Sequence, residues 1–461
     1  MTVHEKPAQL SLRDWDDRYL ELKAQGFQEP EYGGPLSRHL DDGDLRLQKL
    51  RFDNSPESLR LWNFLLTEEE RLKAAKKAGH KLVGTMKDLG TIPVLAYAFP
   101  NMTAFYPDGA WWIPCVMELS AGLLDVADAL GFDESFCPVR AMLGAFVTGA
   151  HFPIPDHLIC SVGATCDDFS AIAQRLAGLG YPIQWWEIPH RRQPGPGEKS
   201  VVLPGGIMAT ETQVSLILDQ LQDIRKALGN LAGIRLTDEM LYQGIQAANR
   251  IRHVLESLRG LVFTAPLCPM PALEILIAEM LAIHFCSDRN ESMVVLQALE
   301  SRVQQRISAN EGYFGKEAVR VFWVNPVADL TAMNVLEDCG GRICGTEYLF
   351  THALDPIPED LDPMEALART ALADPMIGSI RERAERIIVD IEKFGSEAVI
   401  VSRIPGASHC AFEGEIIASE VGKKCNIPVL ECEVPPVCDG IEISLKTRIS
   451  ALIETALHRR E

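Results

Sequence analysis

Three cysteines stand at positions where a thiol could bind a metal. Cys166 and Cys410 each follow a short apolar run that is typical of a buried strand, and each precedes a helical pattern. Cys137 stands at a similar junction between a loop and a helix. A thiol near a helix N-terminus is expected to have a lowered pKa, and the thiolate is the form that binds iron. These three residues are therefore candidate metal ligands.

The cysteine spacing alone does not single out these three. The chain has 12 cysteines, and a free cysteine usually packs as a small buried hydrophobe. No CxxC pair occurs, so compact ferredoxin and zinc motifs are absent. A shared site would have to be assembled by the fold from distant parts of the chain.

The elements around the cysteines indicate two α/β regions. Strands are expected at 157–162 and 183–188 with a helix at 167–179 between them, which is the repeating unit of a parallel sheet. A second region has expected strands at 319–324 and 398–402. In open α/β sheets, ligands gather at the carboxyl ends of the strands. Each region is therefore expected to place a cysteine at the carboxyl edge of its sheet, where ligands bind.

The other segments connect these two regions. A strand is expected at 92–98, and long helical patterns at 211–229, 237–258 and 273–308 indicate a helical bridge. The predicted fold class is α/β, with two Rossmann-like or flavodoxin-like parallel-sheet domains, a helical N-terminal arm and this bridge. The predicted domains are the arm (1–85), the first α/β domain (86–206), the bridge (207–316) and the second α/β domain (317–461).

Short motifs accompany the cysteines in chain order. In this strand context they resemble the cluster-cysteine motifs of the 2-hydroxyacyl-CoA dehydratase and benzoyl-CoA reductase family. The resemblance extends from about residue 81 to the C-terminus and includes the closing helix around Lys446-Thr447-Arg448. The motifs are Phe136-Cys137-Pro138-Val139-Arg140, Thr165-Cys166-Asp167, and Ser408-His409-Cys410 with Asn426-Ile427-Pro428.

The resemblance implies one 4Fe–4S cluster in each core subunit, bound by three cysteines that match Cys137, Cys166 and Cys410. An iron atom without a thiolate ligand is an open Lewis-acid position. The resemblance also implies a second homologous core subunit, ATP-hydrolysing 4Fe–4S activator subunits and a CoA-thioester substrate. No Walker A sequence occurs in this chain, which agrees with ATP hydrolysis by a partner.

Two reactions occur in this family. The dehydratases eliminate water from 2-hydroxyacyl-CoA, and the reductases reduce an aromatic ring attached to a CoA thioester. An aromatic-rich segment before the first motif resembles the larger core subunit of benzoyl-CoA reductase. We therefore predict a benzoyl-CoA type reductase subunit, with a dehydratase subunit as the alternative, although interior packing would also explain these rings. The segment contains Tyr97, Phe99, Phe105, Tyr106, Trp111 and Trp112.

Either reaction needs proton transfer near the cluster. His409 stands beside Cys410, and Glu118 stands on the helix expected before Cys137. These two residues are the predicted catalytic candidates. A structural hydrogen bond or a helix cap is the alternative role for each.

Two further interpretations stay open. One branch of the family carries a double-cubane cluster and uses additional cysteines, at positions where this chain has Leu349 and Lys87 or a neighbour. We therefore favour a single cubane, with Cys339 and Cys344 as the spare thiols that could contradict this choice. The chain could also be a scaffold subunit without a cluster.

Composition excludes some functions. The 461 residues include 64 acidic and 44 basic side chains, and this net charge of −20 argues against a nucleic-acid surface. The polar N-terminus lacks the apolar run of a signal peptide. No stretch reaches about 18 uncharged apolar residues, so no membrane span is expected. These features predict a soluble, cytoplasmic protein.

Overall fold

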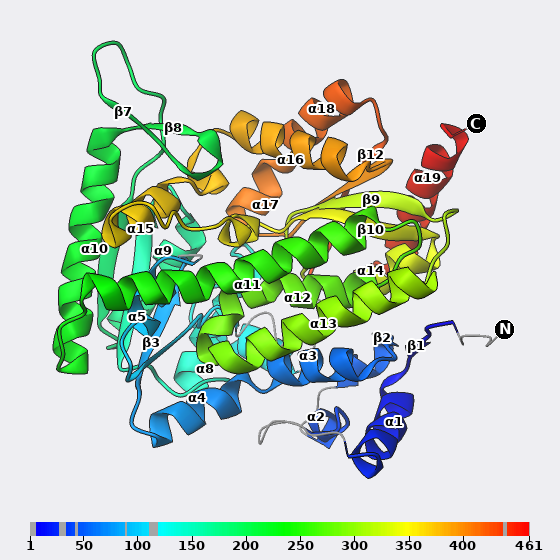
Figure 1. Cartoon of the computed structure of the whole chain (residues 1–461), viewed down its shortest axis with the longest axis horizontal. Helices are drawn as coiled ribbons and strands as arrows, with labels where there is room; N and C mark the ends of the chain where they lie inside the picture. Colours follow the sequence, from blue (N-terminus) through cyan, green and yellow to red (C-terminus); the bar gives the residue numbers. More distant parts are fainter. Residues whose placement is uncertain are drawn as a thin grey trace.

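Two four-stranded parallel sheets form the framework of the chain (Figure 1). In the computed structural model, the first sheet has the strand order β4-β3-β5-β6 and the second has the order β10-β9-β11-β12. When the strands of each sheet are numbered separately, both orders become 2-1-3-4, the order found at the start of flavodoxin-like sheets. The described residues are 6–26, 34–41, 45–87, 90–109, 119–436 and 440–460.

The first sheet and its helices lie in the N-terminal half of the chain. All of its strand pairs are parallel. Its strands are β3 (Lys81–Met86), β4 (Met102–Phe105), β5 (His157–Gly163) and β6 (Ile183–Ile188). The helices between them are α5 (Ile92–Tyr97), α7 (Leu119–Ala129), α8 (Ala141–Thr148) and α9 (Asp167–Gly178).

The second sheet repeats this plan in the C-terminal half. Its strands are β9 (Val319–Val324), β10 (Gly341–Glu347), β11 (Ala398–Arg403) and β12 (Val429–Glu433). Its helices are α14 (Thr331–Asp338), α16 (Ile380–Phe394), α17 (Ser408–Phe412), α18 (Gly414–Cys425) and α19 (Glu442–His458). The two parallel sheets and their order confirm the predicted α/β class, whereas the exact domain boundaries stay predictions.

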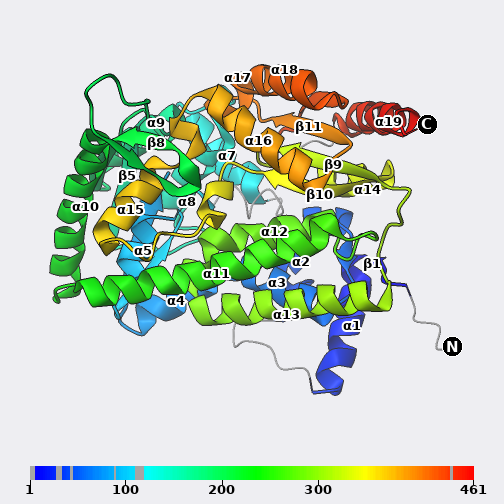
Figure 2. The same cartoon turned by 45° about the horizontal axis from the view of Figure 1, so that its top comes forward.

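Long helices lie between and beside the two sheets (Figures 1 and 2). The bridge consists of α10 (Glu211–Ala232), α11 (Asp238–Thr264), α12 (Ala272–His284) and α13 (Arg289–Ala309). The helix α15 (Pro363–Leu372) packs against α10, and a small hairpin of β7 (Ser200–Val202) and β8 (Met208–Thr210) precedes α10. The arm contains β1 (Gln9–Leu10), α1 (Leu12–Ala24), α2 (Arg38–Asp41), β2 (Phe52–Asp53), α3 (Pro56–Leu66) and α4 (Glu68–Lys77).

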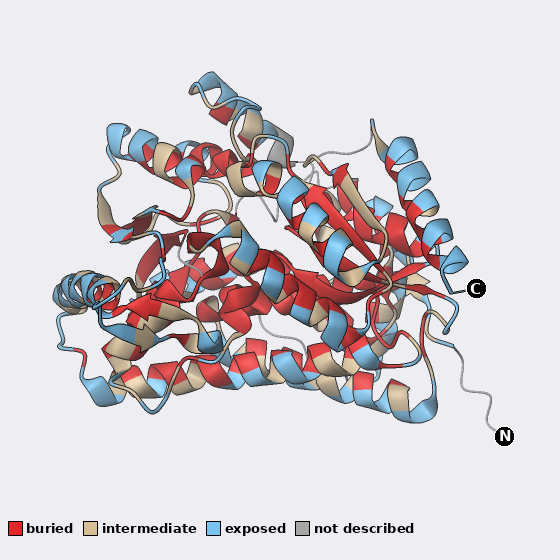
Figure 3. Ribbon diagram, turned by 90° about the horizontal axis from the view of Figure 1, so that it is seen from above, coloured by how far each residue is buried: buried red, intermediate tan, exposed pale blue. Residues whose placement is uncertain are grey.

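The helix α12 is the centre of the core that joins the two halves. All 13 of its residues are buried, and all but Glu274, Glu279 and His284 are apolar, which is typical of a helix inside a protein. One continuous core includes Trp62 of the arm, Ile159 of the first sheet and Trp323 of the second. Figure 3 shows buried residues along both sheets and exposed residues on outer helix faces. Among the described helices, none has the length and apolar character needed to cross a membrane.

Two expected elements differ from the structure. The expected strand at 92–98 is the helix α5, because Pro93 occupies its first turn, where proline favours a helix start. The expected helix at 273–308 is two helices, α12 and α13. Asp288 separates them by accepting hydrogen bonds from the backbone N–H groups of Asn290 (3.1 Å) and Glu291 (3.0 Å), which caps α13.

Candidate functional site

The three candidate cysteines lie on loops that follow equivalent parts of the two sheets. Cys166 follows β5 and is the N-cap residue of α9, and Cys410 follows β11 and lies within α17. Both strands occupy the third position in their sheets. Cys137 directly precedes a short 3-10 helix, Pro138–Arg140, which packs against α9. The fold therefore brings the carboxyl ends of the two sheets together at these loops.

The carboxylate of Asp168 joins all three loops. Asp168 stands in the first turn of α9, two residues after Cys166, and is buried. Its Oδ2 accepts hydrogen bonds from the backbone N–H (3.2 Å) and the hydroxyl (3.1 Å) of Ser408. Its Oδ1 accepts the backbone N–H of Cys137 at 3.4 Å. One side chain thus holds the loops of Cys137, Cys166 and Cys410 against each other.

Gly406 allows the loops of the two halves to approach closely. This residue stands in the turn before α17 with a left-handed φ of +78°. A Cβ atom at this position would lie 2.6 Å from the carbonyl oxygen of Phe136 and 2.7 Å from that of Glu134. Only glycine fits both the backbone conformation and the contact. The loop that carries Cys410 therefore rests directly on the loop that carries Cys137.

The three thiols lie in one electrostatic environment. Cys137 packs against the small apolar cluster that contains Cys410, and the Sγ of Cys166 lies 3.9 Å from the hydroxyl oxygen of Ser408. Burial raises the pKa of Cys137 well above its usual range, and the thiols of Cys166 and Cys410 raise it further. The thiol of Cys166 likewise raises the pKa of Cys410, so charges on these thiols act on one another.

The expected lowering of the thiol pKa values is wrong. Burial raises the pKa of Cys410 to about 12, although the guanidinium of Arg383 opposes this effect. Burial also raises the pKa of Cys166, against the opposing charge of Lys87. Desolvation therefore outweighs the helix N-terminus at these buried sites. Deprotonated thiols would need a bound cation at this position, as metal sites supply.

The thiols fit a cluster better than a single ion. Within the described ranges, no three His, Cys, Asp or Glu side chains converge as ligands of one metal ion would. In a 4Fe–4S cubane, each thiolate binds a different iron atom, so the sulfurs stand apart around the cube. One buried thiol, Cys410, and two half-buried thiols, Cys137 and Cys166, on three loops that are held in contact are compatible with this arrangement.

Of the two predicted catalytic candidates, His409 has a clear structural environment. Its Nδ1 lies 3.0 Å from Glu413 Oε1, and its Nε2 contacts the carbonyl oxygen of Thr165 at 2.5 Å. Glu413 in turn pairs with the buried guanidinium of Arg383 at 2.6 Å. The Nε2 contact thus joins the Cys410 helix to the loop of Cys166, and the Nδ1 contact with Glu413 fixes the orientation of the ring. Glu118 lies outside the described residues.

The spare thiols lie apart from the three-cysteine site. Cys339 stands at the end of α14, before β10, and contacts the carbonyl oxygen of Lys446 at 3.6 Å. Cys344 is buried inside β10 with its sulfur 3.2 Å from the hydroxyl of Ser396. Neither thiol is at the carboxyl edge of the second sheet. Two other described thiols are buried within strands: Cys432 is next to the last residue of β12, and Cys160 inside β5 lies within electrostatic range of Cys166.

A cavity of about 110 Å³ lies beside the cysteine loops, between the ends of the two sheets. Leu349 lines this cavity and also packs against the apolar cluster that contains Cys410. Aromatic rings form much of the wall, with Tyr106 following β4 and with Tyr348 and Phe350 following β10. The apolar side chains of Met280 and Ile283 from α12 also line it.

Strained backbone occurs at the strand ends around this cavity. Lys87 after β3, Asn325 after β9 and Leu349 after β10 have φ values of +52°, +72° and +65°. Such conformations cost non-glycine residues about 1–3 kcal/mol each and cluster at functional sites. Lys87 is also buried, with its ammonium nitrogen 3.1 Å from the sulfur of Met376. These outliers mark the carboxyl edges of both sheets as the functional region.

The polar residues of the cavity are not among the functional residues predicted from the sequence. Lys87, Asp108 and His284 line it. The signal that could have identified the first two is their position, because each stands one to three residues after a strand of the first sheet. No local pattern distinguishes His284, which comes from the far end of α12.

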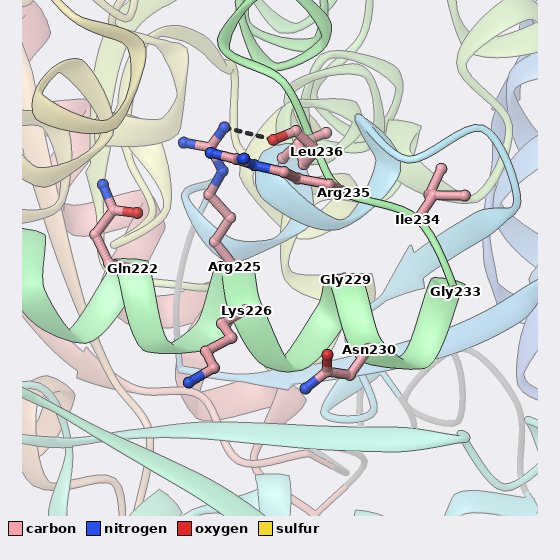
Figure 4. Close-up of a pocket in the computed structure, with 9 residues that line it drawn as sticks. All are labelled: Gln222, Arg225, Lys226, Gly229, Asn230, Gly233, Ile234, Arg235 and Leu236. Carbon is pink, nitrogen blue, oxygen red and sulfur yellow. Dashed lines mark hydrogen bonds between the residues drawn. The ribbon is translucent and has the colours of Figure 1, made fainter.

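A larger pocket lies elsewhere. It has a volume of about 630 Å³ and surrounds the turn between α10 and α11, where Arg225 donates to the carbonyl oxygen of Leu236 at 2.6 Å (Figure 4). Asn101, which precedes β4, donates to Ala232 at the end of α10. This pocket is therefore at the amino edge of the first sheet, opposite the cysteine loops.

Replacing Asp168 with alanine is expected to lower the free energy of unfolding by about 2–4 kcal/mol, because donors of Ser408 and Cys137 would lose a charged acceptor. The matched control is Asp167→Ala, which removes the neighbouring exposed acid of the same helical turn. That change is expected to cost less than about 1 kcal/mol. Denaturant unfolding of both variants measures the difference. Equal losses would contradict the joining role of Asp168.

The comparisons with known proteins agree with this site. A search of the curated proteins found no match. A family model described as 2-hydroxyglutaryl-CoA dehydratase, D-component, matches residues 96–456. The matched range holds the three cysteines and the whole second sheet. The chain therefore belongs to the 2-hydroxyglutaryl-CoA dehydratase D-component family, in agreement with the resemblance of its cysteine motifs to the 2-hydroxyacyl-CoA dehydratases and benzoyl-CoA reductases.

Proposed function

We propose that the chain is a core subunit of an ATP-dependent reductase of aromatic acyl-CoA thioesters, of the benzoyl-CoA type. Family membership supports an enzyme component of the dehydratase and reductase kind in general. The choice of a reductase is supported most directly by the aromatic wall of the cavity beside the cysteine loops. Tyr106, Tyr348 and Phe350 come from the strand ends of both sheets, so both halves would enclose the same acyl group.

Cys137, Cys166 and Cys410 would hold a 4Fe–4S cluster at this edge. When bound, the cluster supplies low-potential electrons and one iron atom without a thiolate ligand. Asp168 and His409 would position the cysteine loops through the hydrogen bonds already described. Leu349 occupies a position where a double-cubane protein would carry a cysteine, which supports a single cubane.

The cavity size supports an aromatic acyl group. A cavity of about 150 Å³ in another protein is large enough to hold benzene. The cavity here, at about 110 Å³, is of the same order and would hold one ring rather than the CoA moiety. Lys87 brings a buried positive charge to the same cavity. Such a charge would stabilise a thioester carbonyl that gains electron density.

The proposal also includes partner subunits. The family name describes a component of a larger dehydratase enzyme. We infer that this chain works with a second homologous core subunit and with an activator that hydrolyses ATP. ATP hydrolysis would drive electrons to a potential near the low end of what iron–sulfur clusters reach, which is about −700 mV at the extreme.

The alternative function is a 2-hydroxyacyl-CoA dehydratase subunit. The family model carries a dehydratase name and supports the alternative and the reductase equally at the level of the family. The two reactions differ in the acyl group, since a dehydratase substrate carries a hydroxyl beside the thioester. The aromatic rings and apolar side chains that form much of the cavity wall favour the ring.

An anaerobic product assay tests the proposed function. The chain, purified with its core partner, would receive activator, ATP and either benzoyl-CoA or a 2-hydroxyacyl-CoA. We expect a ring-reduced thioester from benzoyl-CoA, no product from the second substrate, and no product when ATP is omitted. Water elimination from the 2-hydroxyacyl-CoA without ring reduction would instead establish the alternative. Turnover of neither thioester would overturn both.

A further inference from the structure

The cavity beside the cysteine loops contains a carboxyl group whose hydrogen-bonding capacity is unused. Asp108 follows β4 and lines this cavity. Its Oδ1 is closed off from solvent and has no hydrogen-bond partner among the described residues. The ring of Tyr348 also lines the cavity, but the charges nearest its hydroxyl are those of Glu279 and Arg259. A buried carboxyl oxygen without a partner beside a cavity indicates a missing ligand, because such groups are normally satisfied.

Charged groups from several elements face Asp108. Burial raises its pKa to about 6 from the ordinary 3.8, while the charges of His284 on α12 and Lys87 after β3 oppose the shift and Glu68 on α4 adds to it. Cys160 of β5 also lies within range of its charge. A carboxyl group with this pKa is partly protonated near neutral pH and can act as an acid.

His284 is fixed beside Asp108 by a neighbouring carboxylate. Its Nδ1 lies 3.2 Å from Glu68 Oε1, and both side chains are buried. A Cβ atom on Gly109 would lie 3.2 Å from the Cε1 of His284, so the imidazole rests against the backbone next to Asp108. The ring thus forms a fixed polar wall of the same cavity.

We propose that Asp108 is the acid that delivers a proton to the acyl group reduced in this cavity, an inference that rests on the proposed function. Asp108 suits this role better than its neighbours. The pKa of Tyr348 is raised well above its usual range by burial, which makes it a weak acid. His284 is engaged by Glu68, and both nitrogens of His409 are engaged outside the cavity.

Ring reduction adds two electrons and two protons to the aromatic ring, and the electrons come from the low-potential iron–sulfur donor of the proposed function. The O–H bond of Asp108 breaks and a C–H bond forms on the ring, which leaves Asp108 as a carboxylate. Water supplies the second proton and later reprotonates the carboxylate. Lys87 and His284 face the negative charge that remains after the transfer.

Asp108→Asn is the direct test, because asparagine keeps the shape and cannot donate this proton. We expect unchanged iron content and at least about a 100-fold lower kcat for ring reduction. The kcat of the wild type is expected to fall as the pH rises through about 6, because Asp108 loses its proton. This fall of kcat with pH is expected to be absent in Asp108→Asn. Asp108→Glu is expected to restore part of the rate.

Infrared spectroscopy measures the protonation of the Asp108 carboxyl group without turnover. The infrared band of a protonated carboxyl group, taken as wild type minus Asp108→Asn, is expected to disappear as the pH rises through about 6 and to shift when benzoyl-CoA is added. Glu337→Gln is the matched control. It alters another buried carboxyl whose pKa is raised, to about 7, near the opposite end of α12, about 18 Å along the helix. We expect this control to keep both the fall of kcat with pH and the shift.

The outcomes separate the two proposals. Wild-type activity together with equal activity of Asp108→Asn would overturn the role of Asp108 and leave the proposed function in place. Wild-type inactivity on both thioesters would overturn the proposed function itself. If Asp108→Asn loses its iron, the kcat of Asp108→Glu and the infrared titration test the role of Asp108 instead. An ionised Asp108 across the whole pH range would overturn the inference, and a titration near 6 that responds to benzoyl-CoA would support it.

Discussion

Replacing Cys410 with serine is expected to remove most of the iron from the chain, from about four atoms to near zero. Serine offers an oxygen where the cluster requires a soft thiolate ligand. Cys410 is buried and packs with Cys137, so its sulfur lies in the interior of the proposed site. Cys137→Ser and Cys166→Ser are expected to have the same effect. Iron and acid-labile sulfide analysis after anaerobic purification measures the loss, and the EPR spectrum of the reduced protein provides a second readout.

The control for these variants is Cys425→Ser. Cys425 is the last residue of α18, the helix that follows α17 with its Cys410. It lies about 16 Å along α18 from the first residue of α18. It is expected to keep full iron content. Cys339→Ser and Cys344→Ser, at the spare thiols, are expected to keep it as well. About eight irons in the wild-type chain would indicate a double cubane, and none would indicate a scaffold subunit. Full retention in all three ligand variants would refute the assignment.

Replacing Gly406 with alanine is expected to reduce the free energy of unfolding by about 2–5 kcal/mol and to release the cluster. The methyl group would lie 2.6–2.7 Å from the carbonyl oxygens of Phe136 and Glu134, and the left-handed backbone adds its own cost. The loops of Cys137 and Cys410 would have to separate. Thermal or denaturant unfolding and iron content measure the two effects.

Gly395→Ala separates backbone strain from loop contact. Gly395 ends α16 with a φ of +61°, and nothing lies within 4 Å of its would-be Cβ atom. Its replacement is expected to cost only about 1–2 kcal/mol, from the left-handed conformation, and to leave the iron in place. If Gly406→Ala behaves like Gly395→Ala, the close approach of the two loops is not required for the cluster.

Local sequence patterns predicted the framework of the site well. The strands β6 and β9 occur at the expected residues, and Cys166 lies at the expected strand-to-helix junction. Burial and periodicity are properties of a few consecutive residues, so they can be read from the sequence. The prediction was wrong at α5, because a short apolar run fits a strand or a helix equally well. Pro93 in the first turn favours the helix that the structure has there.

The amino-acid sequence by itself determined the α/β class, the family motifs and the position of each cysteine within its element. Only the tertiary structure decided that the cysteine loops meet, because Asp168 and Ser408 interact across 240 positions of the chain. The tertiary structure also decided the acidity of Asp108 and of the thiols. Their pKa values depend on burial among side chains from distant elements, and desolvation arises only when those elements pack together.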